Sequence, residues 1–303
     1  MTGARFFEGA LSPRRLGLVR VAVCGYATAY VLVRLGHLWA VTDLAPSRFD
    51  PIGVVWLVAD RPLAGSLHAV VLAATILAGV GATLGWRHRW TGPVFAALLW
   101  WTLSYRLSWG QVLHTENLVV LHVAVLGLSR SADAYSIDAR HRPVPRHHSA
   151  EYGWPLQLMT ALTALTYVIA AWAKIRNGGL EWMTGDVLRN QIAYDNLRKH
   201  LLGDVHSAFG GWLTQWRWLF PPMAVASMAV ELGALVAIAR SRLRLYWLLA
   251  AWAFHVGVLA LMAILFPYQL FGFAFLSMLP VEVWWDRARR RTRRRVRSST
   301  AVQ

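Results

Sequence analysis

The stretch "WPLQLMTALTALTYVIAAWAK", residues 154–174, carries a single charge, and that charge is the lysine at its end. About 20 predominantly apolar residues are enough for a helix to cross the hydrocarbon core of a bilayer, which is about 30 Å thick. The stretch therefore predicts a transmembrane helix. Lys174 stands where this helix would leave the membrane. A lysine in that position either anchors the helix at the interface or takes part in chemistry.

Similar apolar runs recur through the chain of 303 residues, which is 56% hydrophobic and only 15% charged. Ordinary soluble domains are about 25% charged. We therefore expect an all-α fold, a polytopic helical membrane protein with about eight transmembrane helices. The expected spans are 16–35, 64–85, 92–108, 112–129, 154–174, 221–239, 245–264 and 267–283.

The distribution of lysine and arginine gives an expected orientation, because cytoplasmic connections carry the excess of these residues. One set of connections is the more basic at nearly every step along the chain. Its arginines are Arg5, Arg14, Arg15, Arg87, Arg89, Arg130, Arg140, Arg142, Arg146, Arg240, Arg242 and Arg244, followed by those of the C-terminal tail. With eight spans, this asymmetry predicts a multi-pass protein of the cell membrane with both termini in the cytoplasm.

The tail contains "DRARRRTRRRVR", residues 286–297, with eight arginines between Arg287 and Arg297. A basic run directly after the last apolar segment is typical of a cytoplasmic tail that lies on anionic lipid headgroups. We therefore expect membrane lipids, and not nucleic acid, as its partners. The predicted organisation is one transmembrane domain, residues 1–285, and an arginine-rich cytoplasmic tail, residues 286–303.

Two segments on the opposite, outer side have their own patterns. "FDPIGVVWLVADRP", residues 49–62, is apolar but too short to cross a bilayer. "GDVLRNQIAYDNLRKHLLG", residues 185–203, has an imperfect apolar face against charged residues, and tryptophans flank it. This pattern predicts an amphipathic helix lying along the outer interface.

Ionisable residues inside or at the end of a span are costly and are therefore candidates for function. Lys174 ends its span on the outer side, and His114 begins its span on the same side. His255 lies near the middle of the seventh span. We expect these residues to contribute to a polar pocket near the outer leaflet. The simpler interpretation is that the lysine is an anchor and that each histidine bonds a neighbouring helix.

Two further ionisable residues, Glu231 and His122, fall in mid-span. Glu231 is expected to pair with Arg34, Arg106 or a histidine across the bundle. The spacings of histidine and glutamate match no tight ligand motif, so we expect no metal site.

Three segments resemble, in order, motifs of the vitamin K-dependent gamma-carboxylases and of the related HTTM membrane domain. "YVIAAWAKIRNGGLEWMTG", residues 167–185, resembles the family's helix that ends in lysine and leads to tryptophan and glycine. "HTENLVVLHVAVLGLSRSADAYSID", residues 114–138, resembles its histidine-led helix. "FHVGVLALMAILFPYQLFGFAFLSMLP", residues 254–280, resembles its "FH…FPY" segment.

The resemblance implies a chemistry for this chain. In the family, a lysine acts as base on reduced vitamin K, and O2 and the quinol then yield a strong base that removes a glutamate proton before CO2 adds. Lys174 matches the catalytic lysine and His114 the essential histidine. His255, with Tyr268 and Trp182, matches the region of quinone contact. The implied cofactors are a reduced, menaquinol-like quinone, CO2 and O2. Burial would favour the neutral amine that a base requires.

The sequence also departs from the family. Ala173 stands where the family often has a second lysine, and the large extracytoplasmic domain of the carboxylases does not follow the last expected span. We therefore keep two alternatives to a carboxylase-like enzyme. One is a membrane component that matures a secreted peptide, similar to the helpers of sporulation-delaying toxins, together with a soluble partner. The other is a non-catalytic membrane scaffold.

Overall fold

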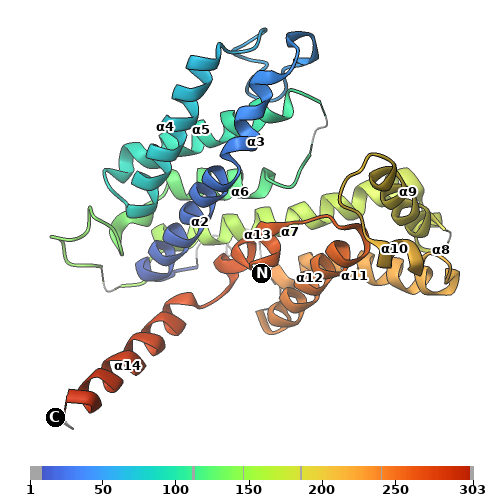
Figure 1. Ribbon diagram of the computed structural model, residues 1–303. Coiled ribbons are helices and arrows are strands. Elements are labelled where there is room, and N and C mark those ends of the chain that lie inside the picture. The colour runs from blue at the N-terminus through green and yellow to red at the C-terminus, as the bar shows by residue number, and fades with distance from the viewer. Residues whose placement is uncertain (1–8, 111–112, 146, 185, 240, 301–303) are drawn as a thin grey trace. The chain divides into compact units, whose positions relative to one another are not determined.

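The computed structural model describes residues 9–110, 113–145, 147–184, 186–239 and 241–300, and the regular secondary structure in these ranges is helical (Figure 1). An isolated bridge between Leu11 and Ser149 is the one β-type pairing recorded within them. Five helices are long and apolar enough to cross a membrane. They are α2 (Pro13–Val33), α4 (Gly65–Leu84), α7 (Ala150–Gly178), α11 (Phe220–Ala239) and α12 (Ser241–Met262). The all-α, polytopic prediction is confirmed at this level.

Two of the other expected spans are helical but differ from these five. Helix α5 (His88–Leu107) has 20 residues, but its arginines and hydroxyl side chains make it less apolar. Helix α6 (Asn117–Gly127) has only 11 residues, although we expected a span at 112–129. Residue 112, where the expected span begins, lies outside the described residues. At the start of α6 the Thr115 hydroxyl donates a hydrogen bond to the carboxylate of Glu116, at 2.5 Å.

The prediction of a continuous helix at 267–283 is wrong. The chain there forms α13 (Pro267–Leu270) and η5 (Phe273–Met278), and α14 (Val281–Thr300) then begins. Two prolines that lack a backbone N–H, Pro267 and Pro280, frame the break. Gly272 between the two short helices has a φ of +78°, a left-handed conformation that ends a right-handed helix. Helix α14 also continues through residue 286, where we expected a separate tail to begin.

The remaining elements are short, except for α9 in the segment predicted to be amphipathic. They are α3 (Leu35–Trp39), η1 (Ala40–Asp43), η2 (Pro46–Arg48), η3 (Ser131–Asp133), α8 (Glu181–Thr184), α9 (Val187–Leu201), α10 (Ala208–Leu213) and η4 (Arg217–Leu219). Helix α9 confirms a helix within 185–203. The apolar segment at 49–62 forms turns, and its Val55 is buried in a small cluster with Val41 and Tyr105.

The chain forms two compact units. The first contains residues 1–159 and 276–303, and the second contains residues 160–275. In the first unit, α2 packs against α4, α4 against α5 and α5 against α6 (Figure 1). Helices α5 and α6 approach closely at Gly92 and Gly127, where a Cβ on Gly127 would lie 2.6 Å from the Gly92 carbonyl oxygen. Only glycine fits such a contact.

A fully buried arginine holds one end of the first unit together. The guanidinium of Arg20, on α2, donates to the carbonyl oxygens of Ala82 and Thr83 at 2.8 Å each. It also donates to the carbonyl oxygens of Ser131 at 3.2 Å and Tyr135 at 2.6 Å. These carbonyls lie at the end of α4 and in the segment after α6. A single side chain on α2 therefore fixes both connections.

The termini of the first unit meet at the same end. Arg15 makes two hydrogen bonds to the carboxylate of Glu282, at 2.8 and 2.7 Å, which place the start of α14 beside the start of α2. The bridge from Leu11 to Ser149 adds the start of α7. The start of α2, the end of α4, the start of α7 and the start of α14 are all flanked by the basic connections identified in the sequence.

The second unit contains most of α7 and the chain from α8 to η5. Helices α11 and α12 pack together, and the Trp247 indole on α12 donates to the Val230 carbonyl at 2.8 Å. Helix α9 lies at the end of α12. Lys199 donates to the Met262 carbonyl at 2.7 Å, and Asn196 donates to the Leu261 carbonyl at 2.8 Å. These side chains satisfy carbonyls that a helix end leaves without partners.

Candidate active site

An ion pair between α7 and α11, with its carboxylate buried and its amine partly exposed, marks the candidate site. The amine of Lys174, on α7, lies 2.6 Å from a carboxylate oxygen of Glu231, on α11. The side chain of Glu231 is 3% exposed and that of Lys174 is 20% exposed. Their mutual attraction is strong because little water screens it. The arrangement places a proton donor and a proton acceptor within one short hydrogen bond in the second unit.

Two aromatic rings lie close to the amine. The Lys174 nitrogen lies 5.0 Å from the ring centroid of Trp182 and 5.7 Å from that of Phe254. Trp182 reaches this position because the chain turns back at Gly179, whose φ is +53°. Such rings stabilise a nearby cation and keep water away from it.

A second polar pair joins α7 to α12. The Nε2 of His255, on α12, and the hydroxyl of Tyr167, on α7, are 2.8 Å apart. His255 is 5% exposed, and its ring also contacts Phe254 and Phe266. The other ring nitrogen of His255, Nδ1, has no hydrogen-bond partner among the described residues.

Helix α7 connects the two pairs. Tyr167 and Lys174 are seven residues apart, so they share a face of the helix at a separation of about 10 Å along its axis. Phe254 bridges them from α12, since it contacts Lys174 and adjoins His255. The structure therefore brings three of the residues chosen from the sequence, Lys174, Trp182 and His255, into one site.

The other two chosen residues lie elsewhere. Tyr268, on α13, belongs to the same unit as Lys174 and is 1% exposed. It stacks on Phe273 with the ring centroids 6.5 Å apart.

His114 belongs to the first unit, where it is exposed just before α6. It adjoins a polar group around Glu116, which accepts a hydrogen bond from the Tyr30 hydroxyl at 2.5 Å. The expectation that His114 and Lys174 act at the same depth stays a prediction.

The expected partners of Glu231 were wrong, because its carboxylate pairs with Lys174. Arg34 donates to the Tyr30 hydroxyl at 3.1 Å, and Arg106 donates to His37 at 2.9 Å, so both are engaged in the first unit. The sequence did contain a signal for this pairing, because a cation and a carboxylate in neighbouring spans usually pair.

His122 follows the simpler interpretation, since its Nε2 lies 3.1 Å from the Met159 carbonyl of a neighbouring helix.

The fold and site define a polytopic helical membrane protein with an ionisable pair buried between its spans. Comparison with known families identifies it further: the HTTM domain matches residues 10–285, so the chain belongs to the HTTM family. No curated protein and no solved structure matches it. Within the described ranges there is no group of three histidine, cysteine or acidic residues that could hold a metal ion.

Proposed function

We propose that this protein is a quinol-dependent membrane enzyme in which Lys174 is the base. The observation that carries the proposal is the 2.6 Å hydrogen bond between Lys174 and the buried carboxylate of Glu231 under an aromatic cover. The sequence motifs around Lys174 and the HTTM assignment support the same chemistry.

A lysine acts as a base only as the neutral amine. In water the ammonium form dominates, but taking both charges out of water costs free energy even when they are paired. Transfer of the proton from the amine to Glu231 removes both charges at once and leaves a free lone pair on Lys174. In this account Glu231 holds the proton until the amine receives another from the substrate. Because Glu231 is buried, water does not stabilise the ionised form of its carboxyl group.

The residues present fit a quinone ring. Trp182, Phe254 and Phe266 offer flat apolar surfaces, which suit a ring that enters from the bilayer. Polar atoms without a hydrogen-bond partner among the described residues are also available here. They are His255 Nδ1, Trp182 Nε1 and Glu231 Oε2. These atoms would hold the two oxygens of the quinone ring, because buried polar groups are normally hydrogen-bonded.

When bound, a reduced vitamin K-type, menaquinol-like quinone supplies with O2 the oxidation that creates a base strong enough for carboxylation of a carbon acid by CO2. The task of this chain is to start that chemistry. With the quinol bound, Lys174 Nζ would accept a proton from one hydroxyl, His255 would orient the ring through the other oxygen, and the aromatic side chains would exclude water. A role for His114, which lies in the first unit, is proposed from the resemblance alone.

The proposal includes a membrane topology. The helix ends that carry the basic connections lie together at one end of the first unit. We place this end in the cytoplasm, because cytoplasmic connections carry the excess of lysine and arginine. With α5 and α6 also crossing, the segment 263–280 must return the chain from the outer end of α12 to α14. Non-helical backbone at membrane depth is tolerated where protein covers it. Tyr268, Gln269 and Phe275 in this segment are buried, which supports an eighth, broken crossing.

In this topology α9 and the end of α7 lie on the outer side. Leu197 and Leu201 of α9 are 58% and 74% exposed, which suits a helix lying in the outer interface. A secreted peptide or protein, delivered with or without a soluble partner, would reach Lys174 from there. Maturation of such a peptide is therefore compatible with the same site.

The second candidate function is a non-catalytic scaffold. A buried lysine–glutamate pair can simply hold two helices together, and the short hydrogen bond between Lys174 and Glu231 favours this reading as well. Mass spectrometry of small molecules that co-purify with the protein separates the two. An enzyme of the proposed kind retains a quinone that is lost in His255→Leu, whereas a scaffold retains none. Absence of quinone from the wild-type protein, after purification in mild detergent and after addition of menaquinol, contradicts the proposal.

A further inference from the structure

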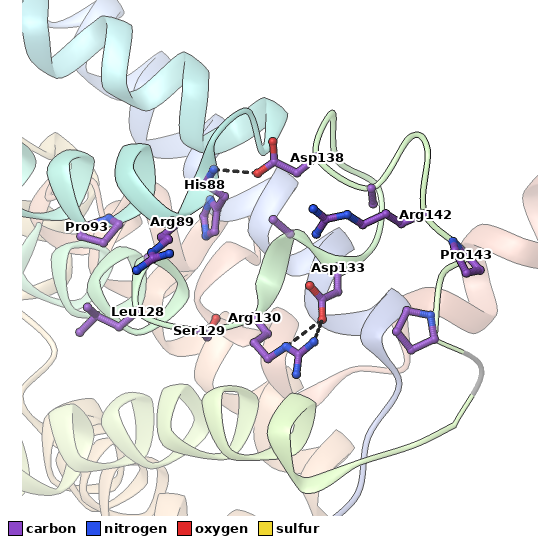
Figure 2. A pocket seen from close by; sticks show the side chains of 14 residues that line it. His88, Arg89, Pro93, Leu128, Ser129, Arg130, Asp133, Asp138, Arg142 and Pro143 are labelled. Carbon is purple, nitrogen blue, oxygen red and sulfur yellow. Dashed lines mark hydrogen bonds and ion pairs between the residues drawn. The ribbon is translucent and has the colours of Figure 1, made fainter.

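A pocket of about 750 Å³ opens in the first unit, at the end where its basic connections meet (Figure 2). The start of α5 contributes His88, Arg89 and Pro93 to its lining. The end of α6 with η3, and the loop that follows η3, complete it. The pocket belongs entirely to the first unit and shares no residue with the candidate active site.

The two carboxylates of the pocket are already engaged. Asp138 accepts hydrogen bonds from the backbone N–H groups of Arg87 and His88, at 2.8 Å each, and so caps the start of α5. Asp133 accepts from Arg130 and from the Tyr152 hydroxyl, at 2.9 Å each. These bonds hold both carboxylates in place in the wall of the pocket.

The arginines of the pocket are not all neutralised in the same way. Arg130 is bound by two carboxylates, since it also donates to Glu151 at 2.9 Å. Arg89 and Arg142 have no ion-pair partner within the ranges that the structure describes. Figure 2 shows the guanidinium of Arg142 turned into the pocket. Two exposed cations therefore remain available to an anion.

The pocket has an apolar edge. Leu128 lines it and is 72% exposed, and Trp90 and Val94, on the adjoining turns of α5, are 67% and 47% exposed. Tryptophan at the end of a membrane helix is typical of the interface between headgroups and acyl chains. A wholly water-soluble anion would gain nothing from these side chains, whereas a lipid would cover them.

We propose that this pocket binds the phosphate of an anionic phospholipid. Arg89 and Arg142 donate to the phosphate oxygens, because the planar guanidinium group matches the geometry of phosphate. The acyl chains run past Leu128 along the exposed side of α5. Basic pockets between transmembrane helices on the cytoplasmic side are known to favour such headgroups.

The test uses the delipidated, full-length protein in neutral detergent. It is titrated with phosphatidylglycerol, with phosphatidylcholine and with inorganic phosphate, and native mass spectrometry counts the bound molecules. We expect phosphatidylglycerol to bind best, and the variant Arg89→Gln/Arg142→Gln to bind it about tenfold more weakly. The control, Arg140→Gln/Arg242→Gln, removes two exposed cations outside the pocket and should change the affinity less than about twofold.

Several outcomes would overturn the assignment. Equal weakening in the two double variants would show a general attraction to basic protein. Equal binding of phosphatidylcholine would remove the need for a net anion. Binding of inorganic phosphate with the same arginine dependence and the same affinity would assign the pocket to a soluble phosphate. Thermal unfolding of both variants checks the fold, and Arg89→Lys/Arg142→Lys, which keeps both charges, should bind between the wild type and the glutamine variant.

Discussion

Arg15 and Glu282 are 267 residues apart in the sequence, yet they form a two-point ion pair at 2.8 and 2.7 Å. The pair joins the start of α2 to the start of α14. It therefore requires both helices to begin at the same end of the first unit, whatever the number of crossings between them. The buried network of Arg20 and the bridge at Leu11 bring the connections before α5 and α7 to that end as well.

The first prediction concerns topology. Reporter fusions after residues 87, 140, 200 and 303 should give cytoplasmic signals at 87, 140 and 303 and an external signal at 200. The reason is that the excess of arginine lies in the connections gathered at one end of the first unit. An external signal from the fusion at 140 or from the one at 303 contradicts the assignment.

The second prediction concerns the stability of the first unit. Arg20→Met should destabilise the protein by about 3 kcal/mol or more, because four carbonyls, two of them in buried hydrogen bonds, lose their donor at once. Thermal or denaturant unfolding in detergent measures this. The matched control is Arg14→Gln on the same helix, which loses an exposed pair at 3.6 Å and should change stability by less than about 0.5 kcal/mol. Equal stability of the two variants would show that the hydrogen bonds of Arg20 contribute nothing to the free energy of unfolding.

The third prediction separates the two nitrogens of His255. His255→Leu should weaken menaquinol binding about tenfold or more, since it removes the unpartnered Nδ1 that we assign to a quinone oxygen. Tyr167→Phe is the control, because it removes the hydrogen bond to Nε2 and leaves Nδ1 in place. Quenching of tryptophan fluorescence by added quinol reports the affinity. If both variants lose binding equally, the role of His255 is only to support the packing of α7 and α12.

The fourth prediction concerns Glu231. Glu231→Gln keeps a hydrogen-bond acceptor beside Lys174 but cannot take its proton, so turnover should fall about 100-fold while the protein remains folded. Asp195→Asn is the control, because Asp195 pairs with Lys199 at 2.7 Å in the same unit, away from the aromatic cover. Rates of quinol oxidation in liposomes measure both. A Glu231→Gln variant as active as Asp195→Asn would limit Glu231 to a structural role.

The fold class followed from the apolar runs because length and composition alone decide whether a helix can cross a bilayer. The apolar runs did not predict the short length of α6 or the break in the segment after α12. At the start of α6, Glu116 accepts hydrogen bonds from Thr115 and from Tyr30, which is far away in the chain. The break at Gly272 could have been predicted from the sequence, since prolines stand on both sides of it.

The site was predicted in part. The resemblance of the segment around Lys174 selected the lysine and Trp182, and the glycines between them allowed their contact. The partner of the lysine was missed because sequence does not give the rotation of one helix against another. Glu231 lies 57 residues away, and only the packing of α11 turns its carboxylate toward α7.

The most direct measurement compares wild type, Lys174→Arg and Lys199→Arg in liposomes that contain menaquinol, with O2 and CO2 supplied and the quinone products identified by mass spectrometry. A base needs a neutral amine, and arginine stays protonated. We therefore expect oxygen-dependent conversion of the quinol to its epoxide by the wild type and by Lys199→Arg, whose lysine is also paired with a carboxylate. We expect none by Lys174→Arg, with folding and membrane insertion unchanged. Conversion at a similar rate by Lys174→Arg, or no quinol chemistry by the wild type under any condition, would contradict the proposal.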